Sequence, residues 1–155
     1  MILSATTFAQ DSAPVKNAVY LDLAGIGGFG SLNYSRHLYS IQHFDFDAFI
    51  GISSTKLKDF ETKFNPQLIL PFGIHATFGN KHYLELGIGS AYVNSVRANN
   101  NFDPERVSTI NGNATIGYKY QKKQGGFLFR AYYTPIFEQY KTIKHWGGLS
   151  LGYAF

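Results

Sequence analysis

The sequence contains no cysteine, which excludes disulfide frameworks, thiolate metal sites and cysteine nucleophiles. No apolar run approaches the roughly 20 residues that a transmembrane helix needs. Charged residues make up only 15% of the 155 positions, against about 25% in an ordinary soluble domain. The formal net charge of +4 is mild and its cations do not form a run. We therefore expect no nucleic-acid partner.

Aromatic residues and glycine are abundant instead. Aromatics account for 17% of the chain, with 11 Tyr and 14 Phe, and there are 16 Gly. A soluble protein of this size has a large surface to cover with polar groups, so few charges beside many aromatics indicate that a medium other than water meets part of the surface.

The composition indicates a single folded domain, because no Pro-, Gly- or Ser-rich linker divides the chain. The N-terminal stretch is small and apolar and reads A-Q-D at residues 9–11, like the tail of a secretory signal without its basic start. We expect residues 1–16 to be a signal-peptide remnant and disordered N-terminus, and residues 17–155 to form the domain.

Strand periodicity dominates the chain. In the last stretch, Leu149, Leu151, Tyr153 and Phe155 share one face, and small residues occupy the other. Clear alternation predicts strands at residues 44–53, 67–78, 82–94, 109–121, 126–134 and 148–155, and weaker alternation adds strands at 18–25 and 31–38. The count is eight.

The composition of the two strand faces decides the fold class. The large apolar residues share one face, whereas the opposite face mixes glycine with single charges. Apolar side chains toward lipid and small or polar ones inside a narrow lumen are what a membrane barrel needs. Closure is required because an open edge leaves backbone groups unpaired in hydrocarbon. Tight connections at 38–43, 79–81 and 122–125 alternate with longer ones at 54–65, 95–107 and 138–145, and the short 25–30 connection joins the second group. The prediction is all-β: a closed antiparallel eight-stranded transmembrane β-barrel with periplasmic termini.

Tyrosines near strand ends and Trp146 suit interfacial girdles where they face lipid, although Tyr20 can instead point inward.

The ending, W-G-G-L-S-L-G-Y-A-F at residues 146–155, looks like the C-terminal signal read by the barrel-assembly machinery. Leu151, Tyr153 and Phe155 match its hydrophobic positions, while Ser150 stands where glycine is usual. With this ending, the chain resembles the small eight-stranded outer-membrane barrels of the OmpA/OmpX type.

The resemblance implies the bacterial outer membrane, with membrane lipid and lipopolysaccharide around the barrel and the assembly machinery as a partner during insertion. Such barrels serve as anchors, adhesins or structural subunits, and a minority are enzymes that act on lipid. We expect a non-enzymatic anchor or accessory subunit of a larger envelope complex. Lysines on the outer loops can meet lipopolysaccharide phosphates, namely Lys56, Lys58, Lys63, Lys141 and Lys144.

Seven ionisable residues fall on the predicted lumen faces: Asp22, Asp45, Asp47, His75, Glu85, Lys119 and Arg130. Unpaired charges in a narrow lumen are costly, so we expect Lys119 to contact Glu85 or another lumen carboxylate, and Arg130 to contact at least one of the four carboxylates. Four carboxylates against two fixed cations leave two negative charges in excess, which protonation of His75 or of one carboxylate would reduce. We expect a sealed plug of ion pairs, with no catalytic residue, cofactor or metal.

Other motifs receive plainer interpretations. Residues 25–30 (G-I-G-G-F-G), with Asp45 and Asp47 about 20 residues on, match the dinucleotide-binding spacing, but a strand-like stretch follows where that motif needs a helix. We interpret these glycines as turn residues. The oxygen-rich loop at residues 99–105 matches no established calcium loop.

Two alternatives to the structural role remain open. A lipid-modifying enzyme would use Ser53 or Ser54 with His145 and Glu138 near the outer rim. A soluble calycin-like barrel would hold an apolar ligand and reverse the two faces, with an apolar lumen and a polar exterior.

Overall fold

Eight strands account for the regular structure of the chain. The computed structural model describes residues 15–54, 56–58, 63–98, 104–137 and 143–155. The strands are β1 Asn17–Leu23, β2 Gly30–Ile41, β3 Phe44–Ile52, β4 Leu68–Gly79, β5 His82–Ala98, β6 Pro104–Gln121, β7 Gly126–Phe137 and β8 Ile143–Ala154. Within these described ranges, no helix is long and apolar enough to cross a bilayer.

The strands close into one antiparallel barrel in sequence order, with β1 paired to both β2 and β8. The closing β1–β8 pairing runs from Ala18 opposite Ala154 to Leu23 opposite Leu149. Reciprocal backbone hydrogen bonds between Asn17 and Phe155, at 2.8 and 2.9 Å, extend it to the last residue. The predicted closed eight-stranded barrel is therefore confirmed.

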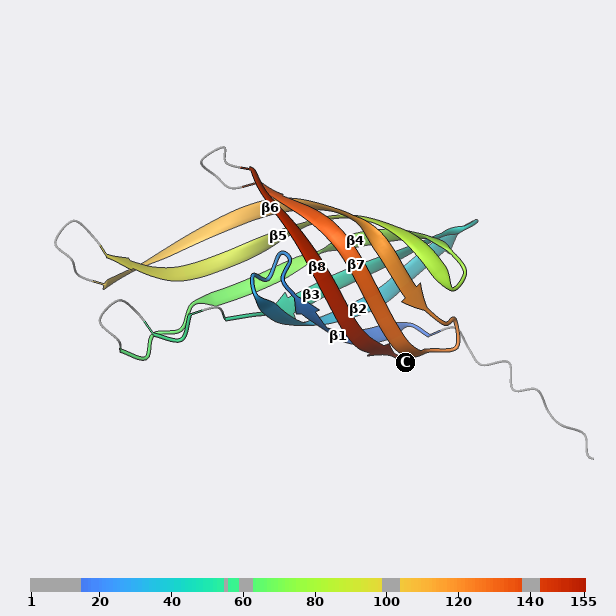
Figure 1. Ribbon diagram of the computed structural model, residues 1–155, viewed down its shortest axis with the longest axis horizontal. Coiled ribbons are helices and arrows are strands. Elements are labelled where there is room, and N and C mark those ends of the chain that lie inside the picture. Colours follow the sequence, from blue (N-terminus) through green and yellow to red (C-terminus); the bar gives the residue numbers. More distant parts are fainter. Residues whose placement is uncertain (1–14, 55, 59–62, 99–103, 138–142) are drawn as a thin grey trace, which may run out of the picture.

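The two ends of the barrel differ. At one end, called here the terminal end, the chain enters β1 and leaves β8 (Figure 1). The connections at this end are short, at residues 42–43, 80–81 and 122–125. The opposite end, called here the loop end, carries the 24–29, 53–67, 99–103 and 138–142 connections, and β5 and β6 extend farther there than the other strands (Figure 1).

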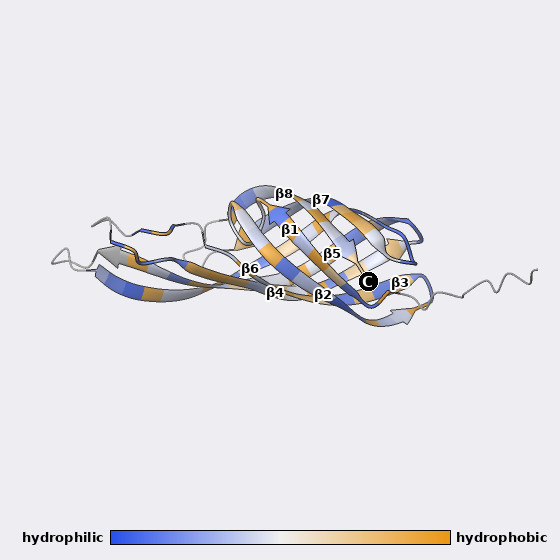
Figure 2. Cartoon of the chain, turned by 90° about the horizontal axis from the view of Figure 1, so that it is seen from below, coloured by the Kyte–Doolittle hydropathy of each residue, from blue (hydrophilic) through white to orange (hydrophobic). Residues whose placement is uncertain are grey.

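The outer face of the wall is apolar. Large side chains that point away from the lumen are exposed on every strand, for example Leu21, Ile50, Phe72, Leu86 and Leu151. Buried inward positions are mostly polar or charged, and orange and blue residues alternate along the strands in Figure 2. This is the facing that a membrane barrel needs, and it is the reverse of what the calycin-like alternative requires.

Small residues on the inner face make room for the few large side chains that fill the lumen. A side chain at Gly87 would collide with the ring of His75, and one at Gly148 would collide with the ring of Tyr132. Glycine is thus required at these positions by the close approach of a buried ring from another strand.

The predicted strand limits need four corrections. The seventh strand runs on from residue 134 to Phe137, and the eighth begins at Ile143 and not near residue 148. The first strand ends at Leu23 and not near residue 25, because Ala24 and Gly25 adopt positive φ angles of 62° and 101° that leave the extended conformation. The second strand runs on to Ile41, with a bulge at Leu38. The predicted 95–107 loop is shorter, because β5 and β6 stay paired as far as Ala98 and Pro104.

Candidate functional site

The seven predicted lumen residues all line the barrel interior. Six of them are buried: Glu85 is 1% exposed, Arg130 3%, Asp22 4%, His75 6%, Lys119 7% and Asp47 8%. Asp45 is half-buried near the terminal end. They form two groups, one around Arg130 and one around Asp47.

Arg130 is the centre of the first group. Its Nε lies 3.1 Å from both carboxylate oxygens of Glu85, and its Nη2 donates to Glu85 Oε1 at 2.6 Å. This forked contact suits a guanidinium, which has five donors in one plane. The guanidinium also lies 4.9 Å from the ring centroids of Tyr20 and Tyr132. Arg130 is therefore held by two aromatic faces and one carboxylate.

Asp22 completes this group from β1. Its Oδ1 lies 3.9 Å from Arg130 Nη1 and accepts a hydrogen bond from Ser150, and its Oδ2 accepts one from Asn33 Nδ2 at 3.1 Å. The Tyr132 hydroxyl also hydrogen-bonds to Asp22. Both oxygens of the carboxylate therefore have polar partners in a region from which the barrel wall excludes bulk water.

Lys119 lies in the second group. Its Nζ donates to Asp47 Oδ2 at 2.9 Å and not to Glu85, the first partner that the sequence suggested. The register explains the choice, because Lys119 is directly opposite Arg130 on β7. Because two neighbouring cations repel each other, they bind different carboxylates. Arg130 binds Glu85, and Lys119 binds Asp47, which is 72 residues away in sequence.

His75 lies between the groups and faces a cation. Its Nε2 is 3.4 Å from Arg130 Nη2, which can only donate, so the ring nitrogen accepts. The ring stacks on Phe49 with centroids 4.4 Å apart. His75 therefore contacts Arg130 and not a lumen carboxylate. The sequence had suggested that a protonated His75 would reduce the excess negative charge of these carboxylates.

His37 is the histidine that contacts a lumen carboxylate, and the sequence reading missed it. Its Nδ1 lies 3.1 Å from Asp47 Oδ1 and its Nε2 lies 3.1 Å from Ser40 Oγ. In a regular strand residues 37 and 40 point to opposite faces, but the bulge at Leu38 brings both to one side. The Ser40 hydroxyl donates to Asp45 Oδ1 at 2.6 Å. Bulges of this kind have no reliable sequence signal.

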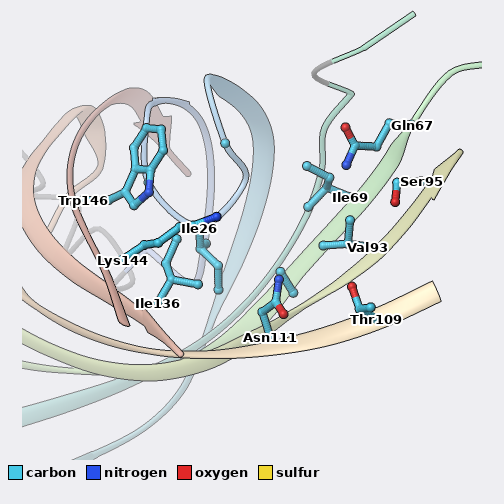
Figure 3. Close-up of a pocket in the computed structure, with 13 residues that line it drawn as sticks. Ile26, Gln67, Ile69, Val93, Ser95, Thr109, Asn111, Ile136, Lys144 and Trp146 are labelled. Atoms are coloured by element: carbon cyan, nitrogen blue, oxygen red, sulfur yellow. The ribbon is translucent and has the colours of Figure 1, made fainter. Parts of the chain in front are cut away.

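Both mouths of the barrel contain a cavity. The terminal-end cavity has a volume of about 390 Å³, and its polar lining includes His37, Asp47 and Lys119. The loop-end cavity has a volume of about 300 Å³ and is lined partly by apolar residues (Figure 3). Between them, the void beside Asp22 and Arg130 is only about 10 Å³, near the lower limit for one water molecule.

The glycine-rich 24–29 connection folds into the barrel mouth. The single hydroxyl proton of Ser53 is shared between the carbonyls of Gly27, at 2.7 Å, and Gly30. Ile26 is buried against Ile69. A strand follows the connection and no helix N-terminus is present to hold a pyrophosphate, which agrees with interpreting these glycines as turn residues.

Two described residues of the proposed enzyme alternative, Ser53 and His145, lie on opposite faces of the barrel wall. The Ser53 hydroxyl points into the lumen, whereas His145 pairs with the Tyr133 hydroxyl on the outer face. Glu138 and most of the 99–105 loop lie outside the described residues. Among the residues that are described, no group of three or more His, Asp or Glu could hold a metal ion.

The predicted assembly signal lies on the outer face of β8. Leu151, Tyr153 and Phe155 are exposed there. Trp146 does not face lipid and so does not belong to an interfacial girdle, because it points into the loop-end cavity. Tyr20 is buried in the lumen, whereas Tyr34, Tyr118 and Tyr133 are exposed.

Comparison with known proteins gives the same architecture. The sequence matches no known family profile and no curated protein. The N-terminal β-barrel domain of Pseudomonas aeruginosa OprF aligns over 93% of this chain and 98% of its own, with a TM-score of 0.61 and 14% identity. Yersinia pestis Ail aligns over 91% and 99%, with a TM-score of 0.56 and 10% identity. Neisserial surface protein A aligns over 90% and 92%, with a TM-score of 0.50 and 15% identity.

In fold and in the chemistry of its two faces, the chain is a closed eight-stranded β-barrel that is similar to these small outer-membrane barrels. The structural neighbours establish the fold, and their low identity carries no activity over to this chain.

Proposed function

We propose that the chain is a non-enzymatic outer-membrane barrel that serves as a membrane anchor or accessory subunit of an envelope assembly, with its lumen closed to ions. The observation that carries the closed lumen is the Arg130 group, where a guanidinium bound to Glu85 and 3.9 Å from Asp22 fills the interior beside a void of about 10 Å³. Eight strands enclose a space that side chains can fill, so no water-filled path is needed.

The distribution of the connections supports an orientation with the terminal end in the periplasm. Short periplasmic turns and longer extracellular loops are the outer-membrane pattern. In this orientation Phe155 and Tyr153 enter the membrane from the side on which the assembly machinery would read them. Lys56 and Lys58 are exposed at the loop end, where lipopolysaccharide phosphates would lie.

An accessory role is supported by the β5–β6 hairpin, which extends beyond the other strands at the loop end (Figure 1). Arg106 on this hairpin donates to Asn94 on β5 and to Asn65 in the 53–67 connection, both at 2.5 Å. These contacts tie the hairpin to the neighbouring connection and present a polar ridge to a partner.

The test is chemical cross-linking in intact cells, followed by native electrophoresis of detergent extracts. A cysteine at Ser108, which is exposed on the hairpin, is compared with one at Lys122, in a turn at the opposite end. The proposal predicts a discrete larger species from Ser108→Cys and none from Lys122→Cys. A monomer from both positions would contradict the accessory role and leave only the anchor.

One arrangement favours an enzyme as the second candidate. Ser40, His37 and Asp47 have the connectivity of a hydrolase triad, with both linking distances at 3.1 Å. However, Ser40 donates its proton to Asp45 and therefore not to His37. We favour a structural hydrogen-bond chain here. Mass spectrometry of lipid A and phospholipids from cells with and without the gene tests the broader question, because a lipid-modifying enzyme would change the profile.

A further inference from the structure

Basic and aromatic side chains gather on the outer face of the wall at the terminal end, beside the 80–81 and 122–125 turns (Figure 1). The backbone N–H of Gln121 donates to the carbonyl of Lys81 at 3.1 Å, which joins the turn before β5 to the end of β6. His82, the first residue of β5, is directly opposite Tyr120 on β6. The group is called here the basic aromatic cluster and consists of Lys81, His82, Tyr118, Tyr120 and Phe127.

The imidazole of His82 is oriented by two tyrosines. Its Nδ1 lies 2.6 Å from the hydroxyl of Tyr118, and its ring centroid lies 5.3 Å from that of Tyr120. When the phenol donates to Nδ1, the ring hydrogen is on Nε2, and a protonated ring has a hydrogen there as well. His82 is exposed, and its Nε2 makes no hydrogen bond to another described residue. Nε2 therefore presents a hydrogen-bond donor at the surface.

Lys81 places a positive charge beside this donor. Its Nζ lies 5.5 Å from the ring centroid of Tyr120, so the ammonium group and the imidazole of His82 lie around the same ring. Four of the described carboxylate side chains line the lumen, and the fifth, Glu105, lies on the β5–β6 hairpin at the loop end. Within the described ranges, no side-chain carboxylate therefore lies on the outer face near Lys81.

The cluster lies where the outer face changes from apolar to polar. Toward the middle of the barrel, Leu84 and Ile116 are about half exposed on the outer face. Beyond the cluster, the turn residues at 80–81 are polar and exposed. Tyrosines, with an apolar ring and a polar hydroxyl, are typical of the level where hydrocarbon meets headgroups. In a membrane, Lys81 and His82 are therefore at the level of the lipid phosphates.

We propose that the basic aromatic cluster binds the phosphodiester of an anionic glycerophospholipid in the leaflet at the terminal end. The ammonium group of Lys81 and Nε2 of His82 contact the phosphate oxygens, as charge-assisted hydrogen bonds favour. The rings of Tyr120 and Phe127, with centroids 6.4 Å apart, pack against the glycerol and the first methylene groups. A headgroup with a net negative charge is preferred, because Lys81 repels the cation of a zwitterionic headgroup. The inference rests on the proposed membrane location, and on the proposed orientation for the choice of leaflet.

The test is native mass spectrometry of the purified barrel in neutral detergent micelles. Phosphatidylglycerol and phosphatidylcholine with the same acyl chains are added in separate titrations. We expect the first phosphatidylglycerol to bind about fivefold more tightly than the first phosphatidylcholine, which is the effect of one lysine near a membrane surface. Higher salt should reduce this preference, because exposed charges are screened.

Two substitutions separate the charge from the hydrogen-bond donor. Lys81→Gln should abolish the preference, so that both lipids bind equally. His82→Phe keeps an aromatic ring and removes the donor, so both lipids should bind about fivefold more weakly while the preference remains. Lys16→Gln is the matched control and should behave like the parent, because Lys16 is exposed at the same end but precedes β1, which is opposite β5 in the closed barrel.

Heat-modifiable migration shows whether each variant is folded. If His82→Phe is not, Tyr118→Phe removes the hydroxyl that orients His82 and should also weaken the binding of both lipids. Equal binding of the two lipids by the parent, or an unchanged preference in folded Lys81→Gln, would overturn the proposal. Equally tight binding of free glycerol phosphate would overturn the choice of a membrane lipid, because the aromatic rings would then contribute nothing.

Failure of the proposed function gives a different result. A barrel that does not enter phospholipid nanodiscs would overturn the membrane location and this proposal together. A barrel that enters them but binds both lipids equally in micelles would overturn this proposal alone. Labelling of Lys122→Cys in intact cells by a membrane-impermeant maleimide would overturn the orientation and the assigned leaflet, because Lys122 is exposed in a turn at the terminal end.

Discussion

Removal of the Arg130 guanidinium is the most informative perturbation of the lumen. In Arg130→Met, Glu85 loses its forked partner at 2.6 and 3.1 Å and Asp22 loses its cation at 3.9 Å, while both carboxylates stay less than 5% exposed. Breaking a buried pair by removing one partner costs about 3–5 kcal/mol. That is about two to four powers of ten in the ratio of folded to unfolded protein.

The assay is urea unfolding in detergent micelles, followed by Trp146 fluorescence. Lys122→Met is the control, because Lys122 is exposed in a turn outside the strands, and the free energy of unfolding of this variant should change by less than about 0.5 kcal/mol. The double variant Arg130→Met with Glu85→Gln removes both charges and should recover part of the loss, which a double-mutant cycle measures. A loss below about 1 kcal/mol for Arg130→Met would refute the claim that the guanidinium is a buried, paired charge.

Three further predictions concern the wall, the C-terminus and the terminal-end mouth. Leu86→Lys places a charge on the lipid face and should lower the free energy of unfolding by about 2–4 kcal/mol, whereas Leu86→Phe should be nearly neutral. If heat-modifiable gels show equal inserted fractions of the two variants, the assignment of Leu86 to the lipid face is contradicted. Phe155→Ala should lower the amount of folded barrel in the outer membrane in cells but not its refolding from urea in vitro; normal cellular amounts would remove the assembly-signal interpretation. Fluorophosphonate probes should not label Ser40, and labelling that Ser40→Ala abolishes would instead identify a hydrolase.

The alternation of side chains made the faces of the barrel predictable from sequence. Because a strand has a period of two, Phe72 and Leu151 fix the lipid side, and His75 and Ser150 the lumen side, regardless of where each strand ends. The strand ends were less predictable, since they depend on pairing. Residues 95–98 (S-V-R-A) lack an alternation of large apolar side chains and were predicted as loop. They remain strand because residues 104–107 are available as partners.

The lumen residues were predictable as a set but not as pairs. The alternation within a residue's own strand decides whether its side chain faces the lumen. Its partner, in contrast, depends on the register of several strands, as the contact between Lys119 and Asp47 across the barrel shows. The bulge at Leu38 and the positive φ of Ala24 leave no sequence signal. For that reason the His37–Ser40 contact and the inward fold of the 24–29 connection were missed.

The central claim is that this barrel has a sealed lumen, and planar-bilayer recording tests it most directly. The purified chain is added to a lipid bilayer under applied voltage, with insertion verified separately by heat-modifiable migration of protein recovered from vesicles of the same lipid. The ion-paired interior predicts no stable conductance from the parent protein. A large, stable conductance would mean a water-filled lumen, and the closed plug around Arg130 would have to be abandoned.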